Sequence, residues 1–417
     1  MLLVERPDEG VGEMTATAPT LGSSAFFRNP YRTYRAILDA GTRVLRLSPH
    51  IVAITHYRDC LDTLRDPRLS AKRYVRQLAH YTEEQQREIS AWTGVSQNMM
   101  FFMDAPDHPR VRKLLVKAFS PESTAALLPR LRALFHEILE PLPTGVPIDF
   151  MGRVAHRFPA LVIGEILGVP RANWDRLMHW SDIFIEFIAM FQAPFELAMQ
   201  ANQATLEMLE YMRELTAQKR SQGGDDVISM MVASEEDGDV LSNEELLSQC
   251  MLLLVAGHET TRNLIGNGLY TLLRHPAELE RLRRDPTLMR SAVEEFLRFE
   301  GPLQGTSRVA MTDLEFYGEK VGAGQSILSM LGCANRDASQ FPDPDRFDPA
   351  RKNNAHLTFG AGAHACLGLH LARLETQIAI PALLERYSRI ELQEDDPPWS
   401  QTLTLRGLKR LNVILNA

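Results

Sequence analysis

Apolar residues recur at helical spacing through most of the chain, whereas alternating apolar positions occur only in short stretches. The longest helical pattern begins after a capping box of Ser242 and Glu245 and ends before Pro276, which predicts an apolar helix over 243–274. The same spacing predicts further helices over 31–40, 57–64, 109–119, 123–139, 150–167, 173–191, 195–221 and 287–299. Residues 72–100 lack a regular pattern, so we expect a surface loop there that carries one short helix.

The alternating stretches predict small β-sheets. Residues 44–47 and 51–54 flank Ser48-Pro49-His50 and predict a β-hairpin. Further strands are expected over 314–317, 326–330, 390–392 and 411–415, the last two as a terminal hairpin. The expected fold class is therefore mainly α with small β-sheets (α+β). Residues 1–23 are polar and contain Gly and Pro, which indicates a flexible leader before a single domain over 24–417. Met14 is an alternative start to Met1.

The overall composition excludes some classes of protein. The 417 residues carry a formal net charge of -8, which argues against general nucleic-acid binding because such proteins present a basic surface. We expect neither a membrane anchor nor a signal peptide, because no apolar stretch reaches the length of a membrane span and charged residues follow the first four positions at once. The four cysteines stand far apart without metal-binding spacing, as is typical of reduced cysteines in a cytoplasmic protein.

One cysteine, Cys366, stands between a glycine-bearing loop and a helical pattern that begins just after it. The N–H groups and the dipole at a helix start favour the thiolate form of a cysteine. Gly360 and Gly362 allow the backbone to pass close to a large flat group. One thiolate, a flat partner and no second cysteine nearby suggest haem iron with an axial cysteine. The alternative is an ordinary buried cysteine before a helix.

The residues around Cys366 form a longer pattern. The stretch 359–368 reads Phe-Gly-x-Gly-x-His-x-Cys-x-Gly at every fixed position and resembles the haem-binding loop of the cytochrome P450 family. This resemblance implies haem b as the cofactor and Cys366 as the ligand of its iron. It implies further haem-binding roles for Phe359, Gly360 and His364. It also implies the triangular helical fold of that family, with the long helix 243–274 over the haem.

The middle of the long helix reads Ala-Gly-His-Glu-Thr-Thr over 256–261 and resembles the oxygen-activation motif of the same family. The resemblance makes Glu259 and Thr260 catalytic, because a hydroxyl can hold an ordered water and a carboxylate can relay protons from solvent. Gly257 leaves room for a ligand on one helix face, and Thr260 can bond back to a carbonyl one turn earlier. Without the resemblance, Glu259 reads as a partly buried acid paired with His258 or Arg262. No prediction is attached to His258.

Haem propionates need cations or hydrogen-bond donors. The segment 104–112 resembles the family's His-x-x-x-Arg segment, which implies His108 and Arg112, and the resemblance adds Arg308 and His364 as further propionate ligands. Each of these residues taken singly is as well explained as a surface cation.

A second motif is expected to be structural. Glu295 and Arg298 stand three apart on a predicted helix and resemble the family's Glu-x-x-Arg pair, which locks to an arginine downstream. We expect Arg346 to be that arginine, with Arg351 as the second choice.

The resemblance also implies a substrate pocket above the haem. Its expected lining residues are Leu253, Ala256, Leu303, Gln304 and Phe187. Such walls imply an apolar substrate of moderate size. Ordinary helix packing is an equal alternative for the aromatic residues near Phe187.

The expected activity is that of a haem-thiolate monooxygenase, which inserts one oxygen atom from O2 into a lipophilic small molecule by hydroxylation or epoxidation. A polyketide or other secondary metabolite is the first expectation for the substrate, and a terpenoid, steroid or fatty acid is the alternative. A peroxide-driven relative would typically lack the acid–alcohol pair, and a non-enzymatic haem sensor or carrier would not need it. No flavin or iron–sulfur segment follows the haem loop, so a separate ferredoxin and ferredoxin reductase are expected to deliver electrons to a cytoplasmic monomer.

Overall fold

The structure is a computed structural model and describes residues 20–190, 192–236 and 241–417. These residues divide into two compact units. Unit 1 comprises residues up to 70, 139–155 and 261–417, and unit 2 comprises 71–138 and 156–260. The expectation of a single domain over 24–417 stays a prediction. Both candidate start methionines, and the predicted leader up to residue 19, lie outside the described residues.

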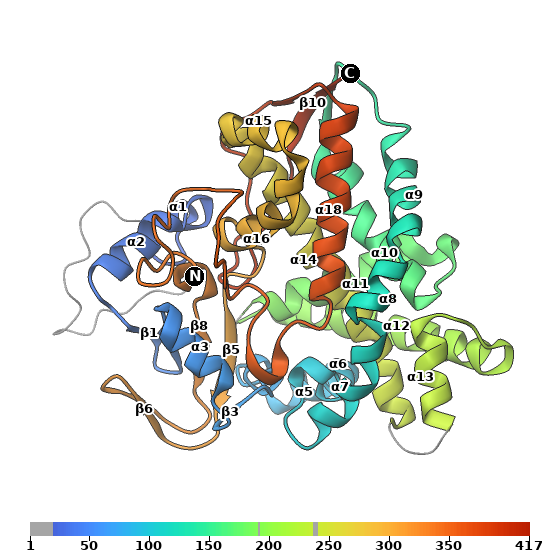
Figure 1. Cartoon of the computed structure of the whole chain (residues 1–417). Helices are drawn as coiled ribbons and strands as arrows, with labels where there is room; N and C mark the ends of the chain where they lie inside the picture. Colours follow the sequence, from blue (N-terminus) through green and yellow to red (C-terminus); the bar gives the residue numbers. More distant parts are fainter. Residues whose placement is uncertain (1–19, 191, 237–240) are drawn as a thin grey trace. The chain divides into compact units, whose positions relative to one another are not determined.

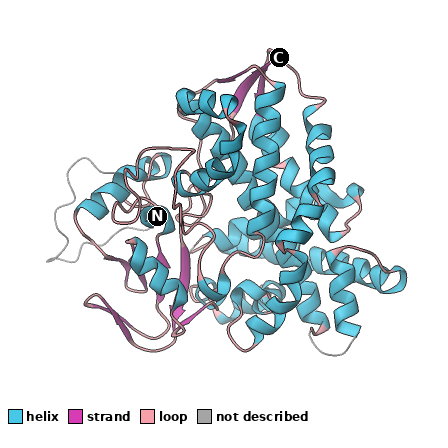
Figure 2. Ribbon diagram, viewed as in Figure 1, coloured by secondary structure: helices cyan, strands magenta, loops and turns pink. Residues whose placement is uncertain are grey.

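Unit 1 combines helices with all the strands of the described residues (Figures 1 and 2). Its helices are α1 (Ser24–Arg28), α2 (Tyr31–Asp39), α3 (Tyr57–Arg65), α15 (Pro276–Arg284), α16 (Met289–Phe299), α17 (Leu331–Ala334) and α18 (Leu369–Arg386). Its strands are β1 (Val44–Ser48), β2 (Ile51–Ile54), β3 (Leu69–Ser70), β4 (Pro147–Asp149), β5 (Thr306–Ala310), β6 (Leu314–Phe316), β7 (Glu319–Val321), β8 (Ser326–Ser329), β9 (Arg389–Leu392) and β10 (Asn412–Asn416).

The main sheet of unit 1 has the strand order β1-β2-β8-β5-β3. β2 and β8 pair in parallel with Ile51 opposite Ser326, and the other neighbouring strands are antiparallel. The predicted hairpin of β1 and β2 is therefore confirmed, as is the antiparallel pairing of β9 with β10. Apolar residues on the sheet and on α3 form the local core: Val52, Ile54, Cys60, Leu64, Leu69, Ala310, Val321, Ile327, Leu331, Ala334 and Leu357.

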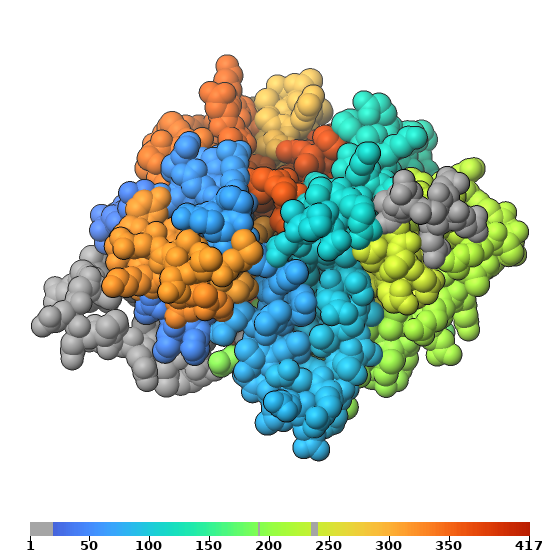
Figure 3. Space-filling view, turned by 90° about the horizontal axis from the view of Figure 1, so that it is seen from below, coloured from blue at the N-terminus to red at the C-terminus, as the bar shows by residue number. Residues whose placement is uncertain are grey.

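The β6–β7 hairpin lies against α3 and β1. Tyr317, which joins its two strands, donates its hydroxyl to Asp59 Oδ1 at 2.5 Å, and Arg46 Nε donates to Glu319 Oε1 at 2.5 Å. In the space-filling view the orange hairpin covers part of the blue segment that contains α3 (Figure 3). Strand β7 and strand β5 were not predicted, because both are short and their pairing partners are distant in the sequence or lie across a tight turn.

Helices α16 and α18 lie side by side in unit 1 (Figure 1). Glu295 and Arg298 are fully buried and joined by two hydrogen bonds of 2.7 and 2.8 Å, as predicted for this pair. The third member is Arg351, whose Nε is 3.1 Å from both carboxylate oxygens of Glu295. The preference for Arg346 was wrong, because Arg346 contributes only its backbone carbonyl, which accepts from Arg298 at 3.2 Å.

Helix α18 begins at Leu369 and runs to Arg386 with Pro381 inside it. Pro381 does not end the helix, although a proline inside a helix removes one backbone hydrogen bond. The residues on either side of the proline, Ile378 to Ile380 and Leu383, are almost fully buried. Packing of this apolar face therefore outweighs the lost backbone hydrogen bond.

The described residues of unit 2 form helices joined by loops, without β-strands. Its helices are α4 (Tyr74–Leu78), α5 (Glu83–Glu88), α6 (Ser90–Gln97), α7 (Asp107–Ala118), α8 (Pro121–Ala126), α9 (Leu128–Leu139, whose last residue belongs to unit 1), α10 (Arg157–Leu167), α11 (Trp174–Ala189), α12 (Phe195–Gln222) and α13 (Val227–Glu236). Helix α14 (Asn243–Arg274) has the predicted bounds, and its residues up to Thr260 belong to unit 2. The capping box of Ser242 and Glu245 is present, with bonds of 2.9 and 3.2 Å.

The polar stretch 72–100 was predicted as a loop with one short helix, and this was wrong. It forms α4, α5 and α6, and the 3₁₀ turn Met100–Phe102 follows. Trp92 in α6 is fully buried, and its backbone N–H donates to Asn202 Oδ1 of α12 at 3.0 Å. The stretch is therefore held by a partner more than a hundred residues away, which local periodicity cannot reveal.

Two other helices differ from their predicted extent. The helix expected over 123–139 is broken at Leu127 into α8 and α9. The helix expected over 150–167 begins with a π-helical turn over Met151–Ala155, and regular α10 starts at Arg157. Helices α13 and α15 were not predicted.

Candidate functional site

The loop before α18 holds Cys366 in a tight conformation within unit 1. Gly360 and Gly362 have φ of 68° and 71°, a region that glycine adopts without strain. These turns let the Cys366 backbone N–H donate to the Phe359 carbonyl at 2.8 Å. A Cβ atom on residue 362 would lie 3.0 Å from the carbonyl oxygen of Leu64, so a larger residue there would crowd α3. The loop thus depends on its glycines, as the pattern predicts.

Cys366 differs from the other cysteines in exposure. Its side chain is half-buried, whereas Cys60, Cys250 and Cys333 are 0% exposed. Burial raises the pKa of the Cys250 thiol to about 12 and raises the pKa of Cys60 and Cys333 as well. Those three remain protonated thiols and are poor metal ligands. Of the four cysteines, Cys366 is the one that is not fully buried.

The chemistry around Cys366 fits a haem group. None of the residues from Phe359 to Leu369 is fully buried although Phe359, Leu367 and Leu369 are apolar, so a flat apolar group could pack on this stretch. His364, in the short 3₁₀ turn Gly362–His364, is half-buried in the same loop. Arg308 lies on β5 and is 6% exposed, and its Nη1 donates to the Ser307 carbonyl at 2.9 Å. A buried guanidinium suits a carboxylate ligand such as a propionate.

In unit 2, the middle of α14 is less buried than the turns before it. Residues 251–255 are buried, but Ala256 is exposed, and Gly257, Glu259 and Thr260 are half-buried. An exposed alanine in the middle of a long buried helix marks open space on its face of the helix. Thr260 Oγ1 donates to the Ala256 carbonyl at 3.3 Å, which is the bond one turn back that we predicted.

Gly257 has a different role from the one expected. A Cβ atom there would lie 2.9 Å from Cδ1 and Cγ1 of Ile163 in α10. The space that the glycine leaves is therefore occupied by a side chain of the protein. The expectation that Gly257 makes room for a ligand was wrong, and the room belongs to the packing of α10 on α14.

Helix α7 carries the other predicted propionate ligands. His108 and Arg112 stand four residues apart, so both lie on one face of the helix. His108 is 3% exposed and Arg112 is half-buried. On the same helix Arg110 is paired with Glu245 of α14, its Nη1 lying 3.1 Å from Oε2, so its charge is already compensated.

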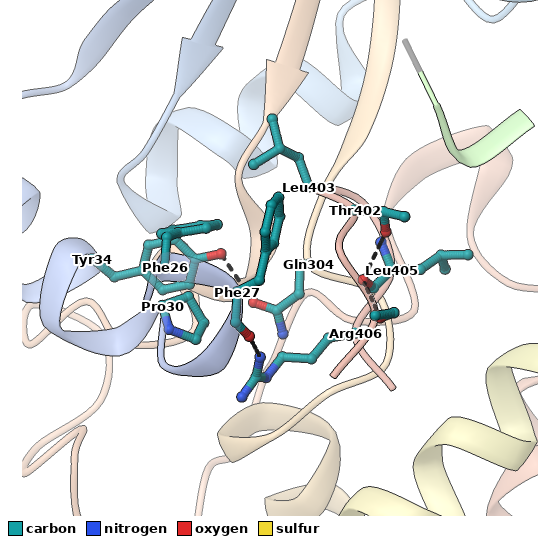
Figure 4. Close-up of a pocket in the computed structure, with 10 residues that line it drawn as sticks. Phe26, Phe27, Pro30, Tyr34, Gln304, Thr402, Leu403, Leu405 and Arg406 are labelled. Carbon is teal, nitrogen blue, oxygen red and sulfur yellow. Dashed lines mark hydrogen bonds between the residues drawn. The ribbon is translucent and has the colours of Figure 1, made fainter. Parts of the chain in front are cut away.

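Leu303 and Gln304 meet the loop before β10 within unit 1. Leu303 forms a β-bridge with Leu405, and the Gln304 backbone N–H donates to the Thr404 carbonyl at 2.8 Å. Figure 4 shows Gln304 and Leu403 beside a small hollow that α1 and α2 also line. The Gln304 amide accepts from the Tyr34 hydroxyl at 3.1 Å and donates to the Gly301 carbonyl at 2.8 Å. The hollow measures about 10 Å³, room for one water molecule and far too small for a lipophilic substrate.

The two remaining pocket candidates lie in unit 2. Phe187 is fully buried and packs edge-to-face on Trp92 with ring centroids 4.8 Å apart. Such a contact is ordinary helix packing, which is the alternative to a role in the pocket wall. Leu253 on α14 is 7% exposed, one turn before Ala256. Phe191, at the end of the predicted helix, lies outside the described residues.

A buried histidine on α14 carried no prediction. His258 is 1% exposed, and its Nε2 lies 3.3 Å from Asp182 Oδ1 of α11. Its Nδ1 lies 3.3 Å from the Leu254 carbonyl. The signal available in the sequence was a polar ring inside an apolar helical run, but its partner is 76 residues away.

Within residues 20–190, 192–236 and 241–417, no helix combines the length and the apolar character that crossing a bilayer requires.

Comparisons with known proteins agree on one family. The sequence model of the family described as "Cytochrome P450" matches residues 162–415. Cytochrome P450 107B1 of Saccharopolyspora erythraea is 39% identical over 366 residues, which cover 86% of this chain and 88% of that protein. The polyketide biosynthesis cytochrome P450 PksS of Bacillus subtilis is 35% identical over 366 residues, covering 87% and 88%.

A solved structure is similar over nearly the whole chain. It is that of P450BioI in complex with hexadec-9Z-enoic acid ligated acyl carrier protein. The TM-score is 0.86 at 35% sequence identity, and the match covers 94% of this chain and 100% of the other. Similarity of this extent includes both the mainly helical architecture and its small sheets, so the predicted fold class is confirmed.

Proposed function

The chain belongs to the cytochrome P450 family, and we propose that it oxidises a lipophilic secondary metabolite of the polyketide type at a haem held by Cys366. The family binds haem b iron through a cysteine thiolate, and its named members similar to this chain are monooxygenases. The enzyme is therefore a haem-thiolate monooxygenase. We propose which residues hold the haem and relay protons. We also propose a substrate class and an electron donor.

One observation carries the assignment of Cys366. Its sulfur is half-buried beside the turns at Gly360 and Gly362, whereas the other three thiols are fully buried. Haem held by the Cys366 sulfur would supply the activation of O2. Phe359 and Gly360 would be the residues of the loop that bind the haem together with Cys366. Four residues would bind the propionates: His108, Arg112, Arg308 and His364.

Glu259 and Thr260 would handle protons. Thr260 Oγ1 now donates to the Ala256 carbonyl at 3.3 Å, a long bond that a rotation about χ1 can exchange for a bond to water. Glu259 directly precedes Thr260 on α14 and is half-buried. Its carboxylate can therefore reach solvent and pass protons to a water held by Thr260. The pair also argues against a peroxide-driven reaction or a mere haem sensor, neither of which needs a proton relay.

Two observations support the substrate class. One relative of similar length carries polyketide biosynthesis in its name, and the exposed face at Ala256 is bordered by the apolar residue Leu253. Leu303 and Phe187 remain candidates for the pocket wall. The Gln304 side-chain amide is already engaged by Tyr34 and Gly301, and its backbone N–H by the Thr404 carbonyl, so we expect Gln304 to hold these segments in place and not to bind substrate.

Electron delivery is proposed to come from a ferredoxin and its reductase. Lys113 and Lys117 are exposed on α7, and a basic helix surface can dock an acidic partner. We also propose a cytoplasmic location, because three of the four cysteines are buried thiols and none is bridged. A monomer is proposed for the oligomeric state. Reduction rates that fall with ionic strength in the wild type, and less steeply in Lys113→Glu, are expected.

The spectrum of the reduced protein with carbon monoxide tests the ligand. The wild type should show the far-red-shifted Soret band of a thiolate-held haem, and Cys366→His should show the band of a nitrogen-held haem. Cys250→Ala, which removes a buried thiol, is the matched control and should keep the wild-type band. A nitrogen-type band in intact wild-type protein would refute Cys366 as ligand. Ligands that shift the ferric spin state, sought among polyketides, steroids, terpenoids and fatty acids, would then identify the substrate class.

A further inference from the structure

Three side chains of types that commonly bind metals converge in unit 2. They are His156, which precedes α10, Asp182 of α11 and His258 of α14. One nitrogen or oxygen atom from each lies within 4.8 Å of the corresponding atoms of the other two. The two imidazole rings stand nearly perpendicular, with centroids 5.8 Å apart and an interplanar angle of 83°. The three elements that carry these residues are far apart in sequence, so the fold brings the cluster together.

The surroundings of His258 favour a proton on Nδ1. Its Nδ1 lies 3.3 Å from the Leu254 carbonyl, and a carbonyl oxygen can only accept. Nδ1 must therefore carry the proton in this contact. The Ser181 hydroxyl, 3.4 Å from the same nitrogen, can accept or donate and is compatible with that tautomer. Nε2 lies 3.3 Å from Asp182 Oδ1, where it can donate to the carboxylate when protonated or offer its lone pair to a cation held by both atoms.

A metal cation between these atoms would replace the proton that otherwise joins Nε2 to the carboxylate. Metal-bound histidines commonly donate their second ring nitrogen to a backbone carbonyl, which is the arrangement of His258 with Leu254. Two imidazoles and one carboxylate are a ligand set that Zn²⁺ accepts, with water in the fourth position. Zn²⁺ bonds of about 2.0–2.1 Å place tetrahedral ligand atoms about 3.3–3.5 Å apart. The His258–Asp182 contact already has this separation.

We propose that His156, Asp182 and His258 form a binding site for a divalent transition metal of the zinc class. His258 is 1% exposed and anchors the site, and Asp182, with 43% of its side chain exposed, leaves a side open for entry and for a water ligand. The bound ion would join the start of α10 to α11 and α14. This inference does not depend on the proposed oxidation chemistry, because it concerns residues that take no part in it.

Zinc content measured against haem iron tests the site. Holoenzyme is stripped with a chelator, equilibrated with about micromolar Zn²⁺, freed of unbound metal and analysed for both elements. We expect about one zinc per iron in the wild type. Asp182→Asn and His156→Gln should raise the dissociation constant for zinc at least about tenfold. His179→Gln removes an exposed histidine from α11 outside the cluster and should leave the ratio unchanged.

A second readout keeps folding defects apart from lost binding. Zinc should raise the melting temperature of the wild type and of His179→Gln, but not that of Asp182→Asn. Asp182 is partly exposed, so its isosteric amide should fold with wild-type haem content. A wild-type ratio near zero, or equal ratios in wild type and both cluster variants, would overturn the proposal and leave His258 and Asp182 as a plain hydrogen-bonded pair.

Discussion

The Cδ1 atom of Ile163 lies 2.9 Å from the point that a Cβ atom on residue 257 would occupy. Ile163 is 2% exposed, so it has little freedom to move away. Helix α10 can approach α14 this closely only because residue 257 is glycine. The glycine therefore serves the packing of two helices of unit 2, one residue before His258.

Gly257→Ala should lower the free energy of unfolding by about 1–3 kcal/mol, because the added methyl group overpacks a filled site. Denaturant titration measures this change. Gly94→Ala is the matched control: Gly94 also lies inside a helix of unit 2, but nothing stands within 4 Å of its missing Cβ, so alanine should stabilise by about 0.5–1 kcal/mol. Ile163→Ala combined with Gly257→Ala should cost less than the sum of the two single changes. Strict additivity would contradict the clash.

Arg351→Ala should lower the free energy of unfolding by about 2–3 kcal/mol, because it removes charge-assisted hydrogen bonds to the buried Glu295. Arg346→Ala should change it by less than about 0.5 kcal/mol, because an exposed side chain is lost while the useful carbonyl remains. Thermal unfolding and haem retention of the two variants provide the comparison. The reverse ranking would restore Arg346 as the partner of Glu295.

Glu294 should stabilise the protein only above acidic pH. Burial raises the pKa of Glu294, but hydrogen bonds from His356 and Arg373 outweigh it and bring the pKa down to about 2. An ordinary glutamate in the unfolded chain has a pKa of about 4.3. The contribution is therefore complete above about pH 4.3 and is lost as pH falls toward about 2, and it amounts to roughly 3 kcal/mol at most.

Unfolding free energies between about pH 2 and 5 test this pH dependence. Glu294→Gln should reduce the pH-dependent loss by up to roughly 3 kcal/mol, whereas Glu280→Gln, which changes a half-exposed carboxylate on α15, should leave the loss unchanged. A wild-type slope retained in Glu294→Gln would show that other groups cause the acid lability.

Thr260→Ala should uncouple oxygen consumption from product formation. The variant loses the hydroxyl that can hold a water, so O2 should still be consumed while product falls by about 100-fold or more and hydrogen peroxide accumulates. Thr260→Ser keeps the hydroxyl and should remain largely coupled. Oxygen, peroxide and product are measured together under turnover with a substrate. Tight coupling in Thr260→Ala would remove Thr260 from the mechanism.

Local signals in the sequence predicted the framework well. The bounds of α14 could be predicted to the residue, because a capping box marks its start and Pro276 marks its end. The motif around Cys366 identified the family, and the comparisons confirm it. The hairpin of β1 and β2 followed from two apolar runs around Pro49.

Interactions between distant residues could not be predicted in this way. The short helices over 74–97 depend on burial of Trp92 and on its bond to Asn202, which is 110 residues away. The choice between Arg346 and Arg351 depends on the path of a loop, which determines whether a side chain or only a carbonyl reaches Glu295. The contact of His258 with Asp182 likewise appears only in three dimensions. The roles of Cys366, Glu259, Thr260 and the propionate ligands remain predictions until their variants are measured.

The unequal exposure of the four cysteines offers a chemical count of cofactor loading. Cys60, Cys250 and Cys333 are sealed in the interior, so a maleimide added to native protein free of haem should label one thiol per chain, at Cys366. Once a metal holds that sulfur, labelling should drop to zero. The number of labels per chain, measured by mass spectrometry, would then report what fraction of a preparation contains haem.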